Sequence, residues 1–506
     1  MISCISVKQM QAADQYTCRH LIPSRELVRR AGEAVFELIK DKGDSFALLC
    51  GKGNNGADGY VIALALWDMG KKCRIFLEKE AFSPDSEHYF SLCREKGIPF
   101  ELWSADSSLA DFDCIIDCIY GIGFHGRVIS RARDMIEAAN VLSAYKISVD
   151  INSGLSGESG MGELFFKSDL TVAIGHYKYG HFLADAADAM KSRAVVDIGI
   201  PLTSDCVPCR VAEESDFSSV LPQRKRNCHK GDFGYVTVMG GSPCYSGAVK
   251  LANLSLSALK SGCGVSRLAC AESLTHSVSP YLLESTLFPV PDEKGDMIFC
   301  PEVLDKIIAS SKAIALGMGW GQGSDNGKIL SFFLEEYSGT LIIDADGINT
   351  LSALDRELIR KAKCSVILTP HPKEFSRLCG KSVEQILSDP VGHAKEYAAE
   401  TGSILLLKGC ATVVTDGKET VICTKGCAGM ASAGSGDLLS GVLAGIHGYN
   451  SPSVLSVACA SYLCGLAGEM AQEKSGDIGM TASDTLAKIP EATHYLQKCG
   501  QHHLNQ

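Results

Sequence analysis

The sequence predicts an α/β protein of two domains, each with a mainly parallel sheet covered by helices on both faces. The first observation is length, because 506 residues are enough for more than one domain at roughly 150 residues each. The second is that short apolar runs alternate with helix-like segments along the whole chain, as in parallel sheets. The third is a polar stretch at 213–234 that lacks this alternation and contains Pro222. We therefore predict domains at 1–214 and 215–506.

The apolar runs give the expected strands in order. In the N-terminal domain they are SFALLCG (45–51), CRIFLE (73–78), DCIIDCIYG (113–121), AYKISVDINSG (144–154), LTVAIG (170–175) and AVVDIGIP (194–201). In the C-terminal domain they are FGYVTVMGG (233–241), GVSRLACAE (264–272), AIALGMGWG (313–321), TLIIDADG (340–347), SVILTPHP (365–372) and SILLLKG (403–409). A last pair, ATVVTDG (411–417) and KETVICT (418–424), predicts a hairpin.

Composition and charge disfavour several classes of protein. Apolar residues make up 46% of the chain and charged residues 21%, which is an ordinary globular balance. The net charge of −11 argues against nucleic-acid and anionic-membrane partners. The N-terminus lacks the pattern of a leader, and the stretch 454–471 is expected to be a buried helix rather than a membrane span. The 22 scattered cysteines favour reduced thiols in a cytoplasmic protein.

Two polar features have plain structural explanations. The motif Cys206-Val-Pro-Cys209 has no second such pair at zinc-finger spacing, so a zinc site is not predicted. The basic cluster of residues 224–226 and Lys230 is expected to be a solvated linker, with a nucleic-acid patch as the alternative.

The loop GKGNNGADGY (51–60) lies between a predicted strand and a predicted helix. Its glycines match the G-x-G-x-x-G pattern of dinucleotide-binding loops, but Asn54, Asn55 and Asp58 crowd it with polar side chains. Asp117 and the pair Asp150 and Ser153 follow two later strands, and the carboxyl ends of parallel strands meet at one edge of a sheet. The pattern favours a ligand site with a cation and a catalytic acid/base over the alternative of three separate helix caps.

The segment CAGMASAGSGDLLSGVLAGI (427–446) carries the strongest signal in the C-terminal domain. Gly434, Ser435 and Gly436 precede Asp437 and a helical pattern, so backbone N–H groups can approach a phosphate at a helix N-terminus. Asp437 then lies where a base would meet an attacking hydroxyl. An Asp-started helix after a glycine turn is the alternative. The accompanying motifs LLLKGCAT and LTPHPKEFSRL favour the phosphoryl-transfer interpretation.

The segments GNNGADG, DCIYGIGFHGR and DINSG, with the opening helices, resemble the YjeF N-terminal family, the NAD(P)H-hydrate epimerases, over about residues 5–205. The resemblance implies a Rossmann-like three-layer sandwich. It implies that two loops bind a hydrated nicotinamide nucleotide through Asn54, Asn55, Gly56, Ala57, Asp58, Gly121, Ile122, Gly123, Phe124, His125, Gly126 and Arg127. It also implies a K⁺ site at Asn55, Asp117 and Ser153, and an acid/base role for Asp150. Nearby phosphates are expected to raise the pKa of Asp150.

The N-terminal half departs from the family pattern at three places. Ala57 replaces a glycine, Asn152 replaces a proline, and Arg29-Arg30 stands where Glu-Asn is frequent. If position 57 needs a positive φ, Ala57 costs about 1 kcal/mol and reshapes the loop. An inactive epimerase domain is therefore one alternative.

The C-terminal half resembles the ribokinase-like fold and, more closely, the YjeF C-terminal family, the ADP-dependent NAD(P)H-hydrate dehydratases. The motifs HKGDFG, GGSPCYSGA, GMGWG, DADGIN, TPHPKEFSRL, KGCAT and GMASAGSGD occur in family order from about residue 229 to 445. The resemblance implies ADP contacts at Lys408, Gly409, Cys410, Ala411, Thr412, Gly434, Ser435 and Gly436. It implies contacts to the hydrated nucleotide at Ala248, Gly321, His371 and Asp437. His371 as a structural histidine, and Asp344 and Asp346 as strand-end caps, are the alternatives.

Together the two resemblances imply a bifunctional repair enzyme. Its substrates would be NADHX and NADPHX, the hydrates of the nicotinamide ring, together with ADP, with ATP not excluded. The N-terminal site would interconvert the R and S epimers, and the C-terminal site would dehydrate the S epimer. K⁺ at the first site, Mg²⁺ with the nucleotide and a homo-oligomer are also expected. The rivals are a ribokinase-like small-molecule kinase and a nucleotide-binding sensor with one or both sites inactive.

Overall fold

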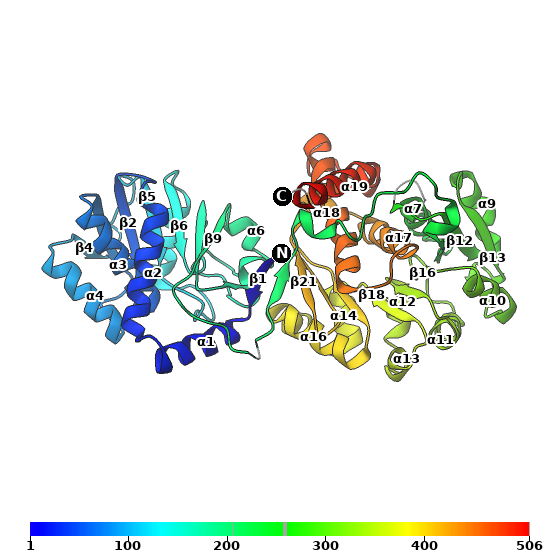
Figure 1. Cartoon of the computed structure of the whole chain (residues 1–506), viewed down its shortest axis with the longest axis horizontal. Coiled ribbons are helices and arrows are strands. Elements are labelled where there is room, and N and C mark those ends of the chain that lie inside the picture. The colour runs from blue at the N-terminus through cyan, green and yellow to red at the C-terminus, as the bar shows by residue number, and fades with distance from the viewer. Residues whose placement is uncertain (205, 257–260, 505–506) are drawn as a thin grey trace. The chain divides into compact units, whose positions relative to one another are not determined.

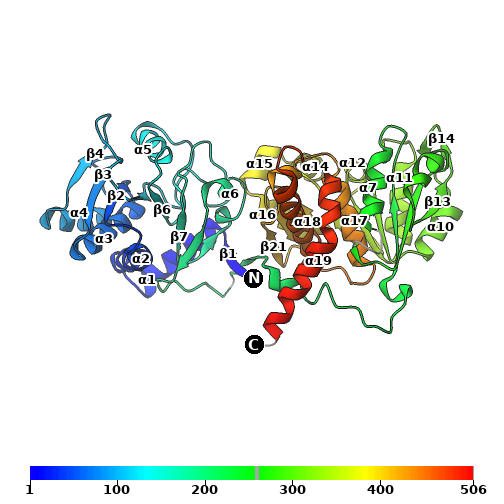
Figure 2. The ribbon, with the colours of Figure 1, turned by 90° about the horizontal axis from the view of Figure 1, so that it is seen from above.

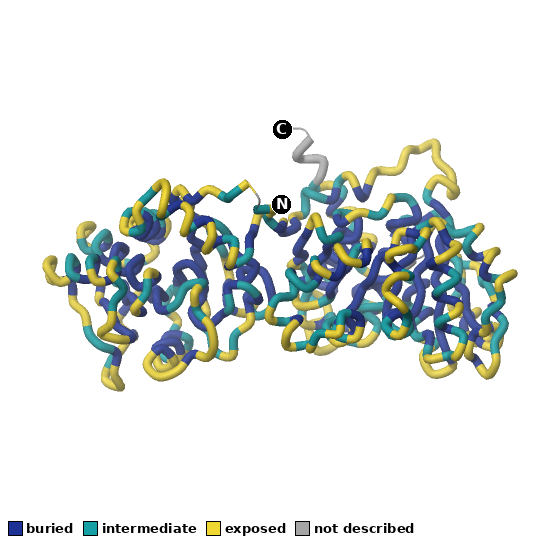
Figure 3. Tube along the Cα trace, turned by 90° about the horizontal axis from the view of Figure 1, so that it is seen from below, coloured by how far each residue is buried: buried dark blue, intermediate teal, exposed yellow. Residues whose placement is uncertain are grey.

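The computed structural model describes residues 1–204, 206–256 and 261–504. The chain divides into two compact units, Ser3–Cys209 and Arg210–Gln506, and Met1–Ile2 belong with the second. Figure 1 shows that each unit is an α/β layered structure with strands between helices. In Figure 3 the buried residues form a continuous interior in each unit.

The N-terminal unit is built on a parallel sheet in the order β4-β3-β2-β5-β6-β7-β9. Separately, β1 pairs with β8 in parallel. All six strands expected here are present, and the short strands β1, β4 and β8 were not predicted. The strands are β1 (Ile2–Ile5), β2 (Ser45–Cys50), β3 (Lys72–Leu77), β4 (Phe100–Leu102), β5 (Cys114–Cys118), β6 (Tyr145–Val149), β7 (Leu170–Ile174), β8 (Tyr177–Lys178) and β9 (Arg193–Val196).

Helices cover both faces of this sheet because its side chains alternate. Phe46 and Leu48 of β2 pack into the core beneath the helices α1 to α4, whereas Ala47 and Leu49 face the core that contains α5. The result is the predicted three-layer sandwich, with strand ends open at one edge. The helices are α1 (Val7–His20), α2 (Ser24–Ile39), α3 (Asn54–Asp68), α4 (Pro84–Glu95), α5 (Ser130–Asn140) and α6 (Ala186–Ala189).

The C-terminal unit contains the sheet order β13-β12-β11-β16-β17-β18-β19-β20-β21-β10. Its pairs are parallel except that β20 runs antiparallel to both β19 and β21. The strands β20 and β21 form the predicted hairpin. A small ribbon, β14 with β15, lies outside it. The strands are β10 (Cys209–Val211), β11 (Tyr235–Met239), β12 (Val265–Ala271), β13 (Thr286–Val290), β14 (Asp292–Glu293), β15 (Asp296–Met297), β16 (Ala313–Leu316), β17 (Thr340–Ile343), β18 (Ser365–Leu368), β19 (Ile404–Leu407), β20 (Thr412–Thr415) and β21 (Thr420–Cys423).

The stretch 454–471 lies in α18, which packs beside α19 (Figure 2). Within the described residues, α18 is long and apolar enough to cross a membrane, but 83% of its most apolar window is buried inside the unit. It is therefore a core helix of this unit. The helices are α7 (Ser246–Leu256), α9 (Thr275–Val278), α10 (Pro301–Ala309), α11 (Asn326–Glu336), α12 (Asp346–Leu351), α13 (Glu357–Arg360), α14 (Pro372–Cys379), α15 (Val383–Ser388), α16 (Pro390–Thr401), α17 (Ser435–His447), α18 (Val454–Ser475) and α19 (Ala482–Leu504).

Candidate active sites

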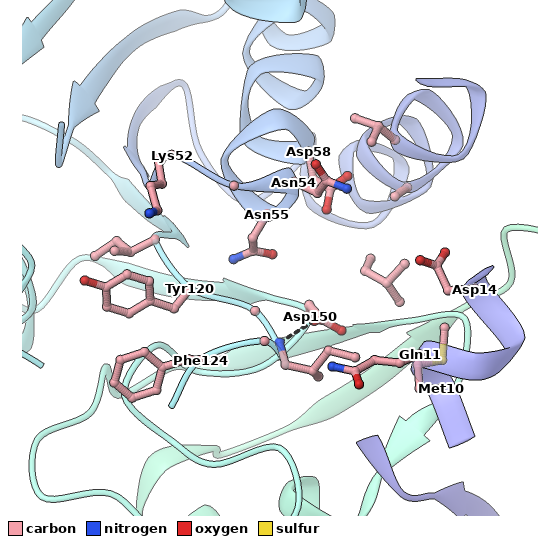
Figure 4. Close-up of a pocket in the computed structure, with 18 of the residues that line it drawn as sticks. Met10, Gln11, Asp14, Lys52, Asn54, Asn55, Asp58, Tyr120, Phe124 and Asp150 are labelled. Carbon is pink, nitrogen blue, oxygen red and sulfur yellow. Dashed lines mark hydrogen bonds between the residues drawn. The ribbon is translucent and has the colours of Figure 1, made fainter. Parts of the chain in front are cut away.

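A cavity of about 780 Å³ opens in the N-terminal unit at the carboxyl ends of the strands (Figure 4). Helices α1 and α2, the N-terminus of α3 and the loops after β5 and β6 form its walls. Most of the predicted substrate-binding residues line it, namely Asn54, Asn55, Asp58, Gly121, Ile122, Gly123, Phe124, His125, Arg127 and Asp150. Gly56, Ala57 and Gly126 are not among its lining residues. Two loops far apart in the sequence therefore meet at one cavity.

Two glycines of the GKGNNGADGY loop allow close approach of the backbone. A methyl group on Gly51 would lie 2.0 Å from the carbonyl oxygen of Ile119, and one on Gly56 would lie 2.0 Å from that of Gly51. The loop therefore packs against the end of β5 and enters α3 directly. Gly53 caps α3 without a side-chain hydrogen bond, so the first-turn N–H groups are available to an anion at the cavity wall.

The departures from the family pattern fit the local structure. Ala57 lies within α3 and is absent from the residues with positive φ, so the expected strain at this position is wrong. Asn152 is fully buried, and its amide nitrogen donates to the carbonyl oxygens of Phe166 and Ala189. Arg29 forms exposed ion pairs within α2. None of these positions is among the residues that line the cavity.

We predict that Ala57→Gly lowers the free energy of unfolding of the N-terminal unit by about 1–2 kcal/mol. A buried methyl group is lost, and glycine is more flexible in the unfolded chain. Urea unfolding of the full chain measures the change. Ala63→Gly, equally buried in the same helix, is the matched control and should lose a similar amount. A gain in stability for Ala57→Gly alone would contradict the helical role of this position.

Asp117 and Ser153 form a buried polar cluster at the strand ends. Asp117 accepts hydrogen bonds from the Ser153 hydroxyl at 2.5 Å, the Ser153 N–H at 2.8 Å and the Ser148 hydroxyl at 2.9 Å. Burial nevertheless raises the pKa of Asp117 to about 6. Asn55 is also buried, and neither its amide oxygen nor its amide nitrogen has a hydrogen-bond partner among the described residues. An unpartnered buried amide oxygen is an unused ligand position.

Asp150 is held in an unusual conformation by charged and polar neighbours. Its φ is +67°, in the left-handed region that side chains rarely adopt. The Lys178 ammonium lies 2.5 Å from one carboxylate oxygen, and the Ile122 N–H donates to the other at 3.0 Å. His181 lies 2.7 Å from the Asp150 carbonyl oxygen through its Nε2. Burial alone raises the pKa of Asp150, but the charge and hydrogen bond of Lys178 exceed it and lower the pKa. Lys178 therefore governs this pKa in the protein itself, and the expected raising of the pKa by substrate phosphates stays a prediction.

Sequence reasoning missed several charged residues of this cavity, and two of them carry a recognisable signal. Lys178 lies on β8, four residues after β7 ends, and its side chain is almost fully buried. Asp14 lies on α1 in register with the buried residues Val7, Met10 and Thr17. In each case the available signal was a charge placed in an apolar pattern, at a strand continuation or on the inner face of an amphipathic helix.

In the C-terminal unit, Asp437 lies in the first turn of α17. The helix follows Gly434, whose φ is +96°, and the Ser435 hydroxyl donates to the Met430 carbonyl oxygen. This turn is the predicted phosphate-binding geometry, with backbone N–H groups at a helix start. Burial, followed by the charges of Asp344 and Asp346, raises the pKa of Asp437 to about 6, despite the opposing charge of Lys408. A carboxylate of this kind is poised to exchange a proton near neutral pH.

Lys408 and Asp344 form an ion pair next to this turn. The Lys408 ammonium lies 2.9 Å from Asp344 Oδ1, and Ser440 donates to Oδ2 at 2.7 Å. A methyl group on Gly436 would lie 3.5 Å from Lys408 Nζ, so the ammonium group reaches the helix start. Burial lowers the pKa of Lys408, but Asp344 and Glu374 raise it further, so this cation stays charged. Asp344 therefore does more than cap a strand end.

Ala248 and Gly321 come together at a second hollow of about 430 Å³. Asp346 also lines this hollow and accepts a hydrogen bond from the Gly321 N–H at 2.8 Å. His371 caps α14, and its Nδ1 accepts from two backbone N–H groups, which leaves Nε2 near Glu374. The Nδ1 atom of His371 therefore has the structural role that the sequence leaves open as the alternative. Among the predicted ADP contacts, Lys408 lies close to the first turn of α17. The next four, Gly409, Cys410, Ala411 and Thr412, lead into β20.

Comparisons with known proteins match both halves of the chain. The family model for NAD(P)H-hydrate dehydratase matches residues 236–491, and that for the YjeF-related protein N-terminus matches residues 24–180. A bifunctional NAD(P)H-hydrate repair enzyme Nnr from Thermofilum pendens is 31% identical, covering 98% of this chain and 96% of that protein. A protein of the same name from Methanothermobacter thermautotrophicus is 32% identical, covering 93% of this chain and 91% of that protein.

A solved structure matches the C-terminal unit. It is the ADP/ATP-dependent NAD(P)H-hydrate dehydratase of Bacillus subtilis, co-crystallised with ATP and Mg²⁺, with 25% identity and a TM-score of 0.50. The match covers 57% of this chain and 99% of that one. Together with the matches over nearly the whole chain, it agrees with the expected ribokinase-like fold. The chain therefore belongs to the family of bifunctional NAD(P)H-hydrate repair enzymes, with an epimerase-type N-terminal domain and a dehydratase-type C-terminal domain.

Proposed function

We propose that the chain repairs hydrated NADH and NADPH in two steps, with the epimerase domain at 1–214 and the dehydratase domain at 215–506. The first site interconverts R- and S-NAD(P)HX. The second dehydrates S-NAD(P)HX at the expense of ADP, giving NAD(P)H, AMP and phosphate. One observation carries the proposal: a single chain has both a carboxylate-lined cavity at the α3 N-terminus and a first-turn carboxylate, Asp437, beside Lys408.

In the epimerase domain, the α3 first turn and the 121–127 loop bind the phosphates and ribose. The free N–H groups after Gly53 and the cations Lys52 and Arg127 at the cavity wall support this assignment. The rings of Tyr120 and Phe124 stack with centroids 4.7 Å apart, and both line the same cavity (Figure 4). Asp150, held ionised by Lys178, exchanges protons at the nicotinamide ring.

Asn55, Asp117 and Ser153 would hold K⁺ in this domain. The unpartnered, buried amide oxygen of Asn55 supports the assignment, because K⁺ takes oxygen ligands. When bound, K⁺ supplies positive charge where Asp117 and substrate phosphates would otherwise repel. The raised pKa of Asp117 shows that its ionised form is disfavoured without such a charge.

We expect K⁺ to raise the melting temperature of the N-terminal unit more than choline at equal ionic strength does. Asn55→Ala should abolish this difference without lowering the basal melting temperature, because the amide has no protein partner to lose. Asn54→Ala is the matched control: its side chain is exposed and bonds Ser83, so the K⁺ response should persist. Differential scanning calorimetry measures both. An Asn55→Ala protein that still responds to K⁺ contradicts the assignment.

In the dehydratase domain, Asp437 takes the proton of the ring hydroxyl, whose oxygen attacks the terminal phosphoryl group of ADP. The N–H groups of residues 434–436 and the Lys408 ammonium stabilise the charge that develops on the phosphoryl oxygens. The ring nitrogen then expels phosphate and NAD(P)H is restored. Mg²⁺ would arrive with the nucleotide and neutralise its phosphates. Within the described residues no group of three or more His, Cys, Asp or Glu side chains could hold a metal ion.

One assay tests the proposal. The chain is given a mixture of R- and S-NADHX with ADP, and the absorbance of reduced nicotinamide is followed. Full recovery, faster than spontaneous epimerisation allows, supports both activities. Recovery of the S fraction alone contradicts the epimerase, and no recovery with ADP or ATP contradicts the dehydratase. Phosphorylation of an added vitamin or sugar without recovery would favour the kinase rival.

We further propose that the protein is cytoplasmic and acts without nucleic-acid or membrane partners. The net charge of −11 and the burial of α18 support this. Sedimentation of the full chain tests the expected homo-oligomer.

A further inference from the structure

Asp14 is a carboxyl group in the N-terminal cavity that neither the fold nor the mechanism above uses. It lies on α1 in register with the buried residues Val7, Met10 and Thr17, where a core position is usually apolar. Its side chain lines the cavity (Figure 4) and has no hydrogen bond or ion pair within the described part of the chain. A half-buried carboxyl group that stabilises nothing locally is a candidate for function.

The charged groups around Asp14 set it apart from Asp150. Asp150 and Lys178 act on it across the cavity, Asp58 approaches from α3, and Cys18 lies one turn along α1. Burial and then the charge of Asp150 raise the pKa of Asp14, while Lys178 opposes them. Asp150 itself is bonded to Lys178 and to a backbone N–H, and its pKa is lowered. The two carboxyl groups of this cavity therefore have pKa values shifted in opposite directions. Such a difference allows one group to act as the acid and the other as the base.

Epimerisation needs chemistry on both faces of the ring carbon that carries the hydroxyl. A single carboxylate on one face can serve the departure or the return of water, but not both. We propose that Asp14 is a second catalytic acid/base residue of the epimerase site, acting on the face of the nicotinamide ring opposite to Asp150. This inference rests on the proposed epimerase function.

The step balances with water as the only co-reactant. Protonated Asp14 gives its proton to the ring hydroxyl, the carbon–oxygen bond breaks, and water leaves as the ring nitrogen's lone pair forms an iminium bond. Water then attacks the opposite face, a new carbon–oxygen bond forms, and ionised Asp150 takes the released proton. Solvent returns this proton from Asp150 to Asp14, since the cavity is open. In the reverse direction the two residues exchange roles.

Asp58 is another acid of this cavity, and its position favours the nucleotide-binding role that the family resemblance implies. It lies in the α3 first turn and is 92% buried, beside the helix N-terminus expected to bind phosphate. Burial raises the pKa of Asp58 well above its usual value, and its place in this turn favours contact with the ribose or phosphates rather than with the ring. Asp14 is set apart from that helix terminus, on α1 (Figure 4).

The test is Asp14→Asn in the full-length protein, assayed on R-NADHX with ADP. We expect the epimerase kcat to fall about 10²-fold or more, with KM changed by less than about threefold, because proton transfer and not binding is lost. The alkaline limb of the kcat–pH profile, which reports loss of the acid's proton, should disappear. Dehydratase activity on S-NADHX, measured on the same sample, should be unchanged, since it belongs to the other unit. Asp134→Asn, exposed on α5, is the control and should keep wild-type kcat.

Two results overturn the role of Asp14: wild-type kcat in Asp14→Asn, or a reduced kcat whose pH profile keeps its alkaline limb. If Asp14→Asn fails to fold, Asp14→Glu gives the answer, because an acid role moves the limb to higher pH by about 0.4 and a structural role leaves it in place. A wild-type protein that does not epimerise at all contradicts the proposed function instead, so the two failures are distinguishable.

Discussion

Asp437→Asn is expected to reduce the dehydratase rate about 10³-fold while epimerisation continues at the wild-type rate. Asparagine keeps the shape of the carboxylate and the first turn of α17, but it cannot take the proton of the ring hydroxyl. The side chain is only partly buried and makes no ion pair with Lys408, whose partner is Asp344, so the fold should survive. Recovery of reduced nicotinamide from pure S-NADHX with ADP measures the loss directly.

The pH dependence separates a base from a binding group at this position. The pKa of Asp437 is raised to about 6, so the ionised base is depleted as pH falls below that value. Wild-type kcat/KM should then fall about tenfold per pH unit, and the residual activity of Asp437→Asn should show no such limb. Asp305→Asn, which changes an exposed carboxylate on α10, is the control and should keep both the wild-type rate and the limb. A wild-type rate in Asp437→Asn, or a variant that keeps the limb, would contradict the proposed base.

The sequence was sufficient for the layers of the fold and for the edge at which the sites form. The apolar run of β2 is recognised as a strand because it is buried on both faces. Asn55 and Asp150 follow strands closely, and Asp117 lies near the end of β5. Such features depend on neighbouring residues in the sequence, so they can be predicted without knowing the tertiary structure. The short strands β4 and β8 lack them, because two or three residues cannot show a period.

The electrostatics of the site could not be read in the same way. The pKa of Asp150 is governed by Lys178, which is 28 residues later. Lys178 follows β7, and β7 runs parallel to β6, so the two residues meet at the same edge of the sheet. The family glycine at position 57 suggested a positive φ there, whereas the backbone conformation of Ala57 depends on where α3 begins. Asp14 lies in an opening helix in which the sequence predicted no site residue. Each of these depends on which elements meet in space, and that information is tertiary.

Lys178→Met is expected to destabilise the N-terminal unit by about 3–5 kcal/mol and to abolish epimerisation. The Lys178 side chain is about 1% exposed and its ammonium lies 2.5 Å from Asp150, so its removal leaves a buried, unpaired carboxylate. Methionine keeps most of the volume, which isolates the loss of charge. Chemical unfolding of the full chain measures the stability, and dehydratase activity reports whether the C-terminal unit stays folded.

The double variant Lys178→Met, Asp150→Asn shows whether the loss comes from the unpaired charge. With both charges gone, this variant should recover most of the lost stability, because a buried ion pair contributes little compared with a neutral replacement of both partners. Epimerisation should stay absent.

The pH dependence of the free energy of unfolding follows from the pKa of Asp150. The wild-type pKa of Asp150 is lowered below 3.8, so its stabilisation is present above that pH and disappears as pH falls through the folded value. In Lys178→Met the pKa rises, so protonation relieves the unpaired charge and the deficit is largest at neutral pH and shrinks in acid. A deficit that does not depend on pH, or a double variant as unstable as the single one, would mean that Lys178 acts through packing rather than by holding Asp150 ionised.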